Sequence, residues 1–478
     1  MHRVVSLCVL LVLVAKGEKL EEKKLRAISS TRRKVLSPDV DYSYNQLGDD
    51  LDGEDIGEKF ASSMAISGDG NRLAIGAEAK QGKGGFYIFD WENDVWTLQS
   101  KQVLGGPNSM FGNSIAMSDD GNTLVVGSPN DFGGGGSIQI FAFDPASKDW
   151  ISSAKFIGEG VDSAGTAVTI SGDAKTVAYS LPSLNNFGGV KTLVMNGSWV
   201  ESGTINSDAY TFFGGSLALT FDGQRLAVGE RLRSQSTGGV KVYDYNSDQS
   251  EWIQNGQTLI GNIAGGRFGS DIDISGDGSR LVVAAMTANT QKGQIRVFDE
   301  DASLALGWSE TFFVDGEAAH DRFGAGARIS NDGSIIVIGA PESDDIGTNG
   351  GEVEVYQYDA NASGNNKFKQ VGIDIGGECS NDEFGSAVVV NGDGTRIVAA
   401  SKKSAAEAGM VRAFEAVLKG TGTVVKNRCP TASPMPSHSP TISMAPSITP
   451  TESGANSKYV SIVSISCSLM LPIFMILF

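Results

Sequence analysis

Few residues in this chain of 478 are of the types that carry acid–base or metal chemistry. The sequence holds 3 histidines and 4 cysteines against 56 aspartates and glutamates. His320 is the only histidine between residues 41 and 420, and no G-x-S-x-G sequence accompanies it. We interpret it as a solvated loop residue. Paired carboxylates, which serve glycosidases, are the chemistry that the composition leaves open.

The acidic residues are concentrated in the middle of the chain. Of the 38 basic and 56 acidic residues, residues 1–40 hold nine and four, and residues 430–478 hold one of each. Residues 41–429 therefore keep 28 basic and 51 acidic groups, a net charge of −23. We expect no nucleic-acid partner, because phosphate binding needs clustered Lys and Arg.

Some of these acids fall in loops where they could attract a basic ligand or hold a divalent cation. The alternative is that they keep an acidic protein soluble. The candidate ligand-binding residues are Asp52, Glu54, Asp55, Asp315, Asp321, Glu342, Asp344, Asp345, Asp382 and Glu383.

A repeated pattern must position these loops. Copies such as FGNSIAMSDDGNTLVVGSP begin at residues 60, 111, 164, 213, 268, 323 and 384, at spacings of 49 to 61 residues. An Asp follows each start by nine positions: Asp69, Asp120, Asp173, Asp222, Asp277, Asp332 and Asp393. A period of this length with strand-like content predicts a β-propeller.

Each copy reads as four strands. The first alternates apolar and small residues, an Asp-Gly hairpin leads to the second, and a glycine opens the third. The fourth carries an aromatic residue, which is Trp96, Trp150, Trp199, Trp252, Trp308 or Phe368. We therefore predict an all-β fold, a seven-bladed propeller of four-stranded blades over residues 41–420.

The seventh copy lacks its own aromatic fourth strand. However, YNQLGDDLDGED from Tyr44 matches FKQVGIDIGGEC from Phe368, and each precedes the next Phe by sixteen residues. We predict that the N-terminal strand completes the last blade and closes the ring, which removes exposed sheet edges.

Phe-Gly-x-Ser followed by Gly-Ala-Pro, as in Gly339-Ala340-Pro341, resembles the FG-GAP repeat of integrin α-subunits. The resemblance covers residues 44–420 and implies an extracellular seven-bladed propeller. The family's calcium hairpins read Asp-x-Asp-x-Asp-Gly-x-x-Asp. Here loops such as Ser67-Gly68-Asp69-Gly70 and Ser330-Asn331-Asp332-Gly333 hold one Asp and no trailing carboxylate, whereas calcium takes six to eight oxygens. We expect no cofactor and no metal in these hairpins, and assign the Asp to turn chemistry.

The two ends of the chain read as targeting segments. Residues 1–17 are typical of a signal peptide, and residues 18–40 of a leader, in which Arg32-Arg33-Lys34 is a possible processing site. Residues 421–453 form a Pro/Ser/Thr-rich segment, expected to be a disordered stalk. Residues 454–478 read as a GPI signal with attachment at Ser453, or as a single-pass anchor. We expect passage through the secretory pathway to the cell surface, with the tail in the membrane.

Oxidising conditions favour pairing of the two cysteines outside the predicted signals, Cys379 and Cys429, although two free thiols remain an alternative. Asn196 and Asn361 begin N-glycosylation sequons. Taken with the resemblance, these features predict a non-enzymatic adhesion or recognition module for an extracellular protein or glycan. An extracellular polysaccharide hydrolase or lyase using loop carboxylates is the alternative.

Overall fold

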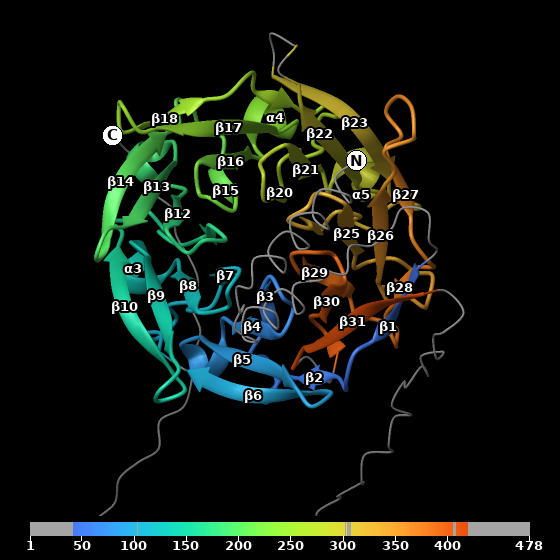
Figure 1. Ribbon diagram of the computed structural model, residues 1–478, viewed down its shortest axis with the longest axis horizontal. Coiled ribbons are helices and arrows are strands. Elements are labelled where there is room, and N and C mark those ends of the chain that lie inside the picture. Colours follow the sequence, from blue (N-terminus) through green and yellow to red (C-terminus); the bar gives the residue numbers. More distant parts are fainter. Residues whose placement is uncertain (1–41, 103, 302, 304–306, 405–407, 419–478) are drawn as a thin grey trace, which may run out of the picture. The chain divides into compact units, whose positions relative to one another are not determined.

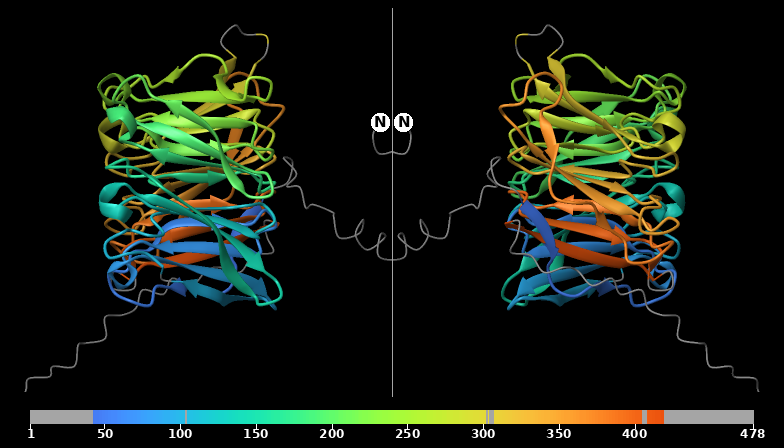
Figure 2. Two further views of the ribbon diagram at one scale, coloured as in Figure 1. Left: turned by 90° about the vertical axis from the view of Figure 1, so that its left-hand side faces the viewer. Right: turned by 90° about the vertical axis from the view of Figure 1, so that its right-hand side faces the viewer.

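The computed structural model describes residues 42–418, apart from residues 103, 302, 304–306 and 405–407. These residues form seven antiparallel sheets arranged as a ring (Figure 1). Side views show strands crossing the thickness of the ring, with turns gathered at its two faces (Figure 2). The predicted all-β, seven-bladed propeller is confirmed for this part of the chain. The predicted leader, stalk and C-terminal segments, with Ser453, lie outside the described residues.

Blades one to six, and the first three strands of blade seven, follow chain order from the axis outward. The first strands, nearest the axis, are β3 (Phe60–Ile66), β7 (Ser114–Met117), β11 (Val168–Ile170), β15 (Phe213–Leu219), β20 (Ile272–Ile274), β24 (Gly326–Ile329) and β29 (Phe384–Val390). The second strands are β4 (Arg72–Ala77), β8 (Thr123–Ser128), β12 (Thr176–Leu181), β16 (Arg225–Glu230), β21 (Arg280–Ala284), β25 (Ile335–Ala340) and β30 (Arg396–Ser401). The alternating first-strand pattern predicted from the sequence is therefore the wall of the central channel.

The outer half of each blade holds the third and fourth strands. The third strands are β5 (Gly85–Glu92), β9 (Ser137–Asp144), β13 (Gly189–Met195), β17 (Gly239–Asn246), β22 (Gln294–Glu300), β26 (Glu352–Tyr358) and β31 (Met410–Leu418). The fourth strands are β6 (Val95–Gln102), β10 (Asp149–Ile157), β14 (Trp199–Asn206), β18 (Glu251–Gln254) with β19 (Leu259–Ile260), β23 (Trp308–Asp315), and β27 (Phe368–Gln370) with β28 (Ile375–Gly376). Each predicted aromatic lies in one of these fourth strands.

The loop after the second strand holds a short helical turn in five blades. These turns are η1 (Lys80–Gly82), α3 (Asp131–Gly134), η2 (Leu184–Asn186), α4 (Arg233–Ser236) and α5 (Ala288–Gln291). The glycine that ends this loop has a positive φ, and it brings the loop against the next blade. A Cβ on Gly84 would lie 2.1 Å from the carbonyl oxygen of Phe111. Glycine is therefore required at this contact.

The seventh blade takes its fourth strand from the N-terminal end of the propeller. β1 (Tyr42–Gln46) pairs antiparallel with β31, with Tyr44 opposite Ala416, and β2 (Leu51–Asp52) continues the pairing. These two segments match β27 and β28 of the sixth blade, as the alignment of Tyr44 with Phe368 predicted. The predicted closure of the ring by the N-terminal strand is confirmed.

The core is divided among the contacts between blades. Seven apolar clusters are found among the described residues, and each joins two adjoining blades. One of them packs Phe60 and Tyr87 of blade one against Val398 and Val411 of blade seven. Each blade therefore buries its apolar surface only against its neighbours.

An arginine clamp also joins four pairs of blades. Arg396, at the start of β30, donates to the carbonyl oxygen of Gly70 in the Asp-Gly hairpin of blade one at 3.0 Å, and its guanidinium lies 5.7 Å from the Trp91 ring. The equivalent residues Arg72, Arg225 and Arg280 reach the hairpin carbonyls of Gly121, Gly278 and Gly333. They too lie over an aromatic ring of the next blade. Three of these four rings, Trp91, Phe143 and Tyr358, belong to third strands and not to the predicted fourth-strand aromatics. The contact was not predicted from the sequence.

Removing the clamp at the ring closure is expected to weaken the whole ring. We expect Arg396→Ala to lower the free energy of unfolding by about 2 kcal/mol, because it removes a charge-assisted hydrogen bond and a cation–π contact. The measurement is a shift of the urea unfolding midpoint followed by tryptophan fluorescence. The matched control is Lys175→Ala, a hairpin residue whose side chain is exposed and paired only with Asp173. Equal midpoints for the two variants would contradict the role of the clamp.

Candidate functional site

The two faces of the ring differ in how their acidic residues are used. On the face of the Asp-Gly hairpins, Asp69 accepts bonds from Ser67 Oγ at 2.7 Å and from the backbone N–H of Asn71 at 2.9 Å. Burial opposes ionisation of Asp69, but these bonds outweigh it and lower its pKa. The same carboxylate bonds recur in the other six hairpins, at Asp120, Asp173, Asp222, Asp277, Asp332 and Asp393. The interpretation of these residues as turn-formers is confirmed.

The opposite face carries the loops that precede each first strand and follow each second strand, and we call it the loop face. Its largest departure from the repeat is in blade six. Eleven positions separate Ala340 from Gly351, whereas seven or eight separate the equivalent residues of the other blades. The longer loop adds Asp344 and Asp345, and it leads directly into β26.

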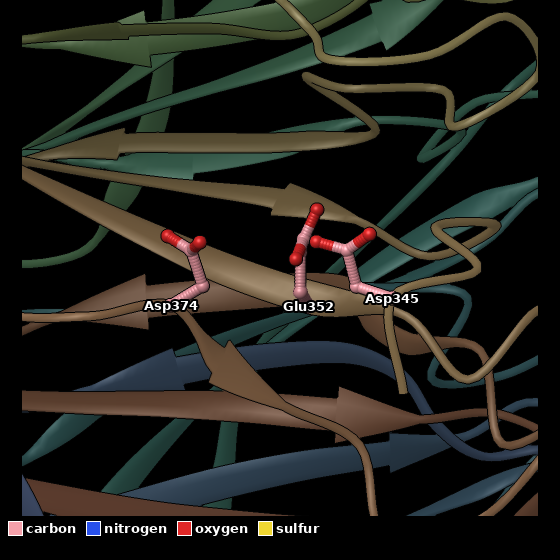
Figure 3. A group of neighbouring side chains, drawn as sticks. All are labelled: Asp345, Glu352 and Asp374. Carbon is pink, nitrogen blue, oxygen red and sulfur yellow. The ribbon is translucent and has the colours of Figure 1, made fainter. Parts of the chain in front are cut away.

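Three carboxylates meet where this loop enters the strand. Asp345 comes from the loop, Glu352 is the first residue of β26, and Asp374 immediately precedes β28. One ligand oxygen of each lies within 4.8 Å of the others. Figure 3 shows the three side chains together, with Glu352 in the middle. We call these three residues the blade-six acidic cluster.

Burial makes the charges of this region costly. Glu352 is only 3% exposed and Glu354, on the same side of β26, is 6% exposed. Burial, followed by repulsion from neighbouring acids, raises the pKa of each to about 7. The hydroxyl groups of Ser343 and Tyr356 partly offset this effect. Neither carboxylate forms an ion pair with any residue in the described part of the chain.

The other blades show that the fold does not require these acids. The first residue of the third strand is neutral in every other blade: Gly85, Ser137, Gly189, Gly239, Gln294 and Met410. Two positions later, Glu354 stands where four blades carry a cation: Lys191, Lys241, Arg296 and Arg412. Blade six alone therefore carries two acids in these positions. This internal comparison is the sequence signal that could have identified Glu352 and Glu354, which the sequence analysis missed along with Asp374.

The geometry of the cluster suits a positively charged group. Two oxygens on opposite sides of a calcium ion lie roughly 5 Å apart, since each Ca–O bond is about 2.4 Å. The three carboxylate oxygens already lie within that separation. A lysine ammonium or arginine guanidinium of a ligand would find the same acceptors.

Of the ten acidic residues predicted to bind ligand, only Asp345 belongs to the blade-six acidic cluster. Asp321 lies near it, is 5% exposed, and has a pKa raised by burial and by the charges of Asp344 and Asp345. Asp344 itself accepts a bond from the backbone N–H of Asn349 at 2.8 Å, which shapes the loop.

The remaining predicted residues serve local structure or lie elsewhere. Four of them form ion pairs. Glu54 and Asp55 both pair with Lys80, Glu342 pairs with Arg322, and Glu383 pairs with Lys403. Asp315 accepts from Gln294, and Asp382 accepts from the backbone N–H of Cys379. Asp52 is exposed at the end of β2. The structure therefore does not bring the ten residues together as one site.

A second group of charges lines the central channel, whose cavity is about 200 Å³. Arg328 of β24 donates to Asp271 of the neighbouring blade at 2.6 Å, and Asp273 accepts from the backbone N–H of Ile329 at 2.9 Å. Burial raises the pKa of Asp273 to about 6. These carboxylates link two blades, as Ser63 and Ser114 do elsewhere through the carbonyls of Gly112 and Gly165. We therefore assign them to the frame of the ring.

His320, Cys379 and the two sequon residues lie in turns or bends. His320 is exposed in a loop with a φ of 79°. Cys379 is disulfide-bonded, and its predicted partner Cys429 lies outside the described residues. The sequon residues Asn196 and Asn361 are both exposed. Within the described part of the chain, no helix has the length and apolar character needed to cross a membrane.

Comparison with protein-family models finds no match, and comparison with curated proteins finds none either. Among solved structures, Kuenenia stuttgartiensis hydrazine synthase is similar, with a TM-score of 0.51 and 13% identity over 77% of this chain and 97% of that one. Putative 6-phosphogluconolactonases from Bacteroides uniformis ATCC 8492 and Bacteroides fragilis NCTC 9343 have TM-scores of 0.49 and 0.47 at 16% and 14% identity. They cover 66% and 67% of this chain, and 85% and 84% of their own. At 13% identity, the likeness to hydrazine synthase concerns the fold alone.

The buried carboxyl group of Glu352 predicts how the stability of the protein depends on pH. The pKa of Glu352 is about 7 in the folded protein and near 4.5 when unfolded, so the folded state holds its proton more tightly between these values. Stability is therefore lost as pH rises from about 4.5 to 7. We expect Glu352→Gln to remove roughly 2 kcal/mol of this loss, measured as the difference between variant and parent in urea unfolding at pH 5 and pH 8.

The control for this prediction is Glu251→Gln, an exposed acid at the start of β18. Its pH dependence should follow that of the parent. If Glu352→Gln also followed the parent, the carboxyl would be ionised throughout the range, and the assigned effect of burial would be wrong.

Proposed function

We propose that this protein is a non-enzymatic recognition module of the cell surface, which binds an extracellular protein or glycan through its loop face. The observation that carries the proposal is the pair of buried carboxylates Glu352 and Glu354, which lack a cationic partner in the described part of the chain. Leaving buried charge uncompensated is costly unless a ligand supplies the opposite charge. The blade-six acidic cluster would bind a positive group of the ligand, directly or through a calcium ion.

The division of the ring into two faces supports this proposal. The hairpin face repeats the same turn seven times, and its Asp side chains are engaged in those turns. The loop face varies from blade to blade in loop length and in charge. Variable loops on a regular scaffold are where binding residues are concentrated in proteins of this kind.

The sequence supports the proposed setting. The FG-GAP resemblance implies an extracellular propeller, and the predicted signal peptide, stalk and hydrophobic tail would hold it outside the membrane.

A binding experiment tests the proposal. The full chain, displayed on cells, is applied to arrays of matrix proteins and glycans in calcium and in EDTA. We expect saturable binding that falls at least tenfold in Glu352→Gln/Glu354→Gln and is unchanged in Glu251→Gln. A loss in EDTA would assign the contact to calcium, and its persistence would assign it to a basic group of the ligand. Saturable binding that the double variant leaves intact would overturn the role of the cluster.

The raised pKa of Glu352 also favours a second candidate, an extracellular polysaccharide hydrolase or lyase. A carboxyl that stays protonated near neutral pH is what a general acid requires, and other carboxylates lie beside it. The test is release of reducing ends from wall polysaccharides by the full chain, compared with Glu352→Gln. Turnover lost in that variant would establish the enzyme and displace the recognition proposal.

A further inference from the structure

A second pocket lies on the loop face where blade seven meets blade one. It has a volume of about 630 Å³, within the range of roughly 300–1,000 Å³ typical of small-ligand sites. Its charged and polar lining includes Lys59, Ser62, Glu78, Glu383, Lys402 and Lys403. No residue of the blade-six acidic cluster contributes to it.

Two of the three lysines that line this pocket form ion pairs with its two glutamates, and the third, Lys402, does not. Lys59 Nζ lies 2.6 Å from Glu78, and Lys403 Nζ lies 2.7 Å from Glu383. Lys402 forms no ion pair or hydrogen bond with any described residue, and no aromatic ring lies under its ammonium group. Three lysines against two glutamates give the pocket a net charge of +1, in a segment whose net charge is −23.

The ammonium group of Lys402 is influenced by neighbouring charges and is accessible to a ligand. Burial lowers the pKa of its ammonium group, and repulsion from Lys59 adds to this, while Glu78 and Glu383 oppose it. The residue nevertheless remains exposed to solvent. An anionic ligand at this exposed ammonium group would offset the repulsion between Lys402 and Lys59.

The repeat shows that the cation is particular to this blade. Eighteen positions after the start of each copy, just past the second strand, blades one to seven carry Glu78, Pro129, Pro182, Arg231, Met286, Pro341 and Lys402. Arg231 is the only other cation at this repeat position, and its guanidinium carbon lies 4.0 Å from the centre of the Phe212 ring. The backbone accepts proline at this position in three blades, so Lys402 is not needed for the turn.

We propose that this pocket binds an oxyanion, a carboxylate or sulfate group carried by a ligand of saccharide size. Lys402 would form the ion pair, and the neutral side chains of Ser62 and Asn113, which also line the pocket, would contact the rest of the ligand. This inference goes beyond the proposed function, because the site is separate from the blade-six acidic cluster and has the opposite charge.

Calorimetric titration of the full chain at low ionic strength tests the site. The probes are digalacturonic acid, sodium sulfate and maltose. We expect one or both anions to bind and maltose to bind at least tenfold more weakly. Lys402→Ala should weaken anion binding at least tenfold, and Lys402→Arg should retain it. Binding of digalacturonic acid alone would assign the site to carboxylates, and binding of sulfate alone to sulfate groups.

Controls separate this site from misfolding and from the proposed function. Lys175→Ala removes a lysine on the hairpin face and should leave anion binding unchanged, and so should Glu352→Gln. Unfolding midpoints of Lys402→Ala and the parent should agree, since the lysine has no described partner. Absence of binding by both anions, equal binding of maltose, or anion binding unchanged in Lys402→Ala would overturn the proposal.

Discussion

The apolar core of this protein exists only between blades, and the rest of the structure depends on that constraint. A single four-stranded sheet has two faces, and here each face is covered by the neighbouring sheet. A ring left open would expose the apolar faces of its first and last blades to water. Pairing of β1 with β31 prevents this, and it places Phe60 and Tyr87 against Val398 and Val411. The closing strand and the arginine clamp of Arg396 act at the same boundary.

The polar connections between blades follow the same repeat. Hairpin backbones bond from blade to blade around the hairpin end of the channel, for example from the N–H of Gly68 to the carbonyl of Asp119 and from the N–H of Gly392 to that of Gly68. These contacts use the backbone and the invariant turn of each copy. The side chains of the loop face take little part in them, so this face can vary without disturbing the ring.

Two sites of opposite charge result on that face. In blade six, acids replace the neutral and basic residues found at the start of other third strands, and they lie where burial raises their pKa. At the junction of blades seven and one, the pocket is lined by three lysines and only two glutamates, and Lys402 is the lysine outside the two ion pairs. In both places the described residues leave charge without an ion-pair partner of the opposite sign, which is the basis for the two proposed binding sites.

The repeat period, the Asp-Gly hairpins and the match between Tyr44 and Phe368 were enough to determine the seven blades and their closure from the sequence. These features are local or periodic, and each copy confirms the others. The blade-six acidic cluster could not be predicted from the sequence in the same way. Ten acids were predicted from loop position, yet Lys80, Arg322 and Lys403 neutralise four of them, and only Asp345 joins Glu352 and Asp374. Sequence position determines which face a residue occupies, whereas the pairing of charges depends on side chains that come from different strands and blades. Only the tertiary structure decided which carboxylates are buried together and which lysine has no ion-pair partner among the described residues.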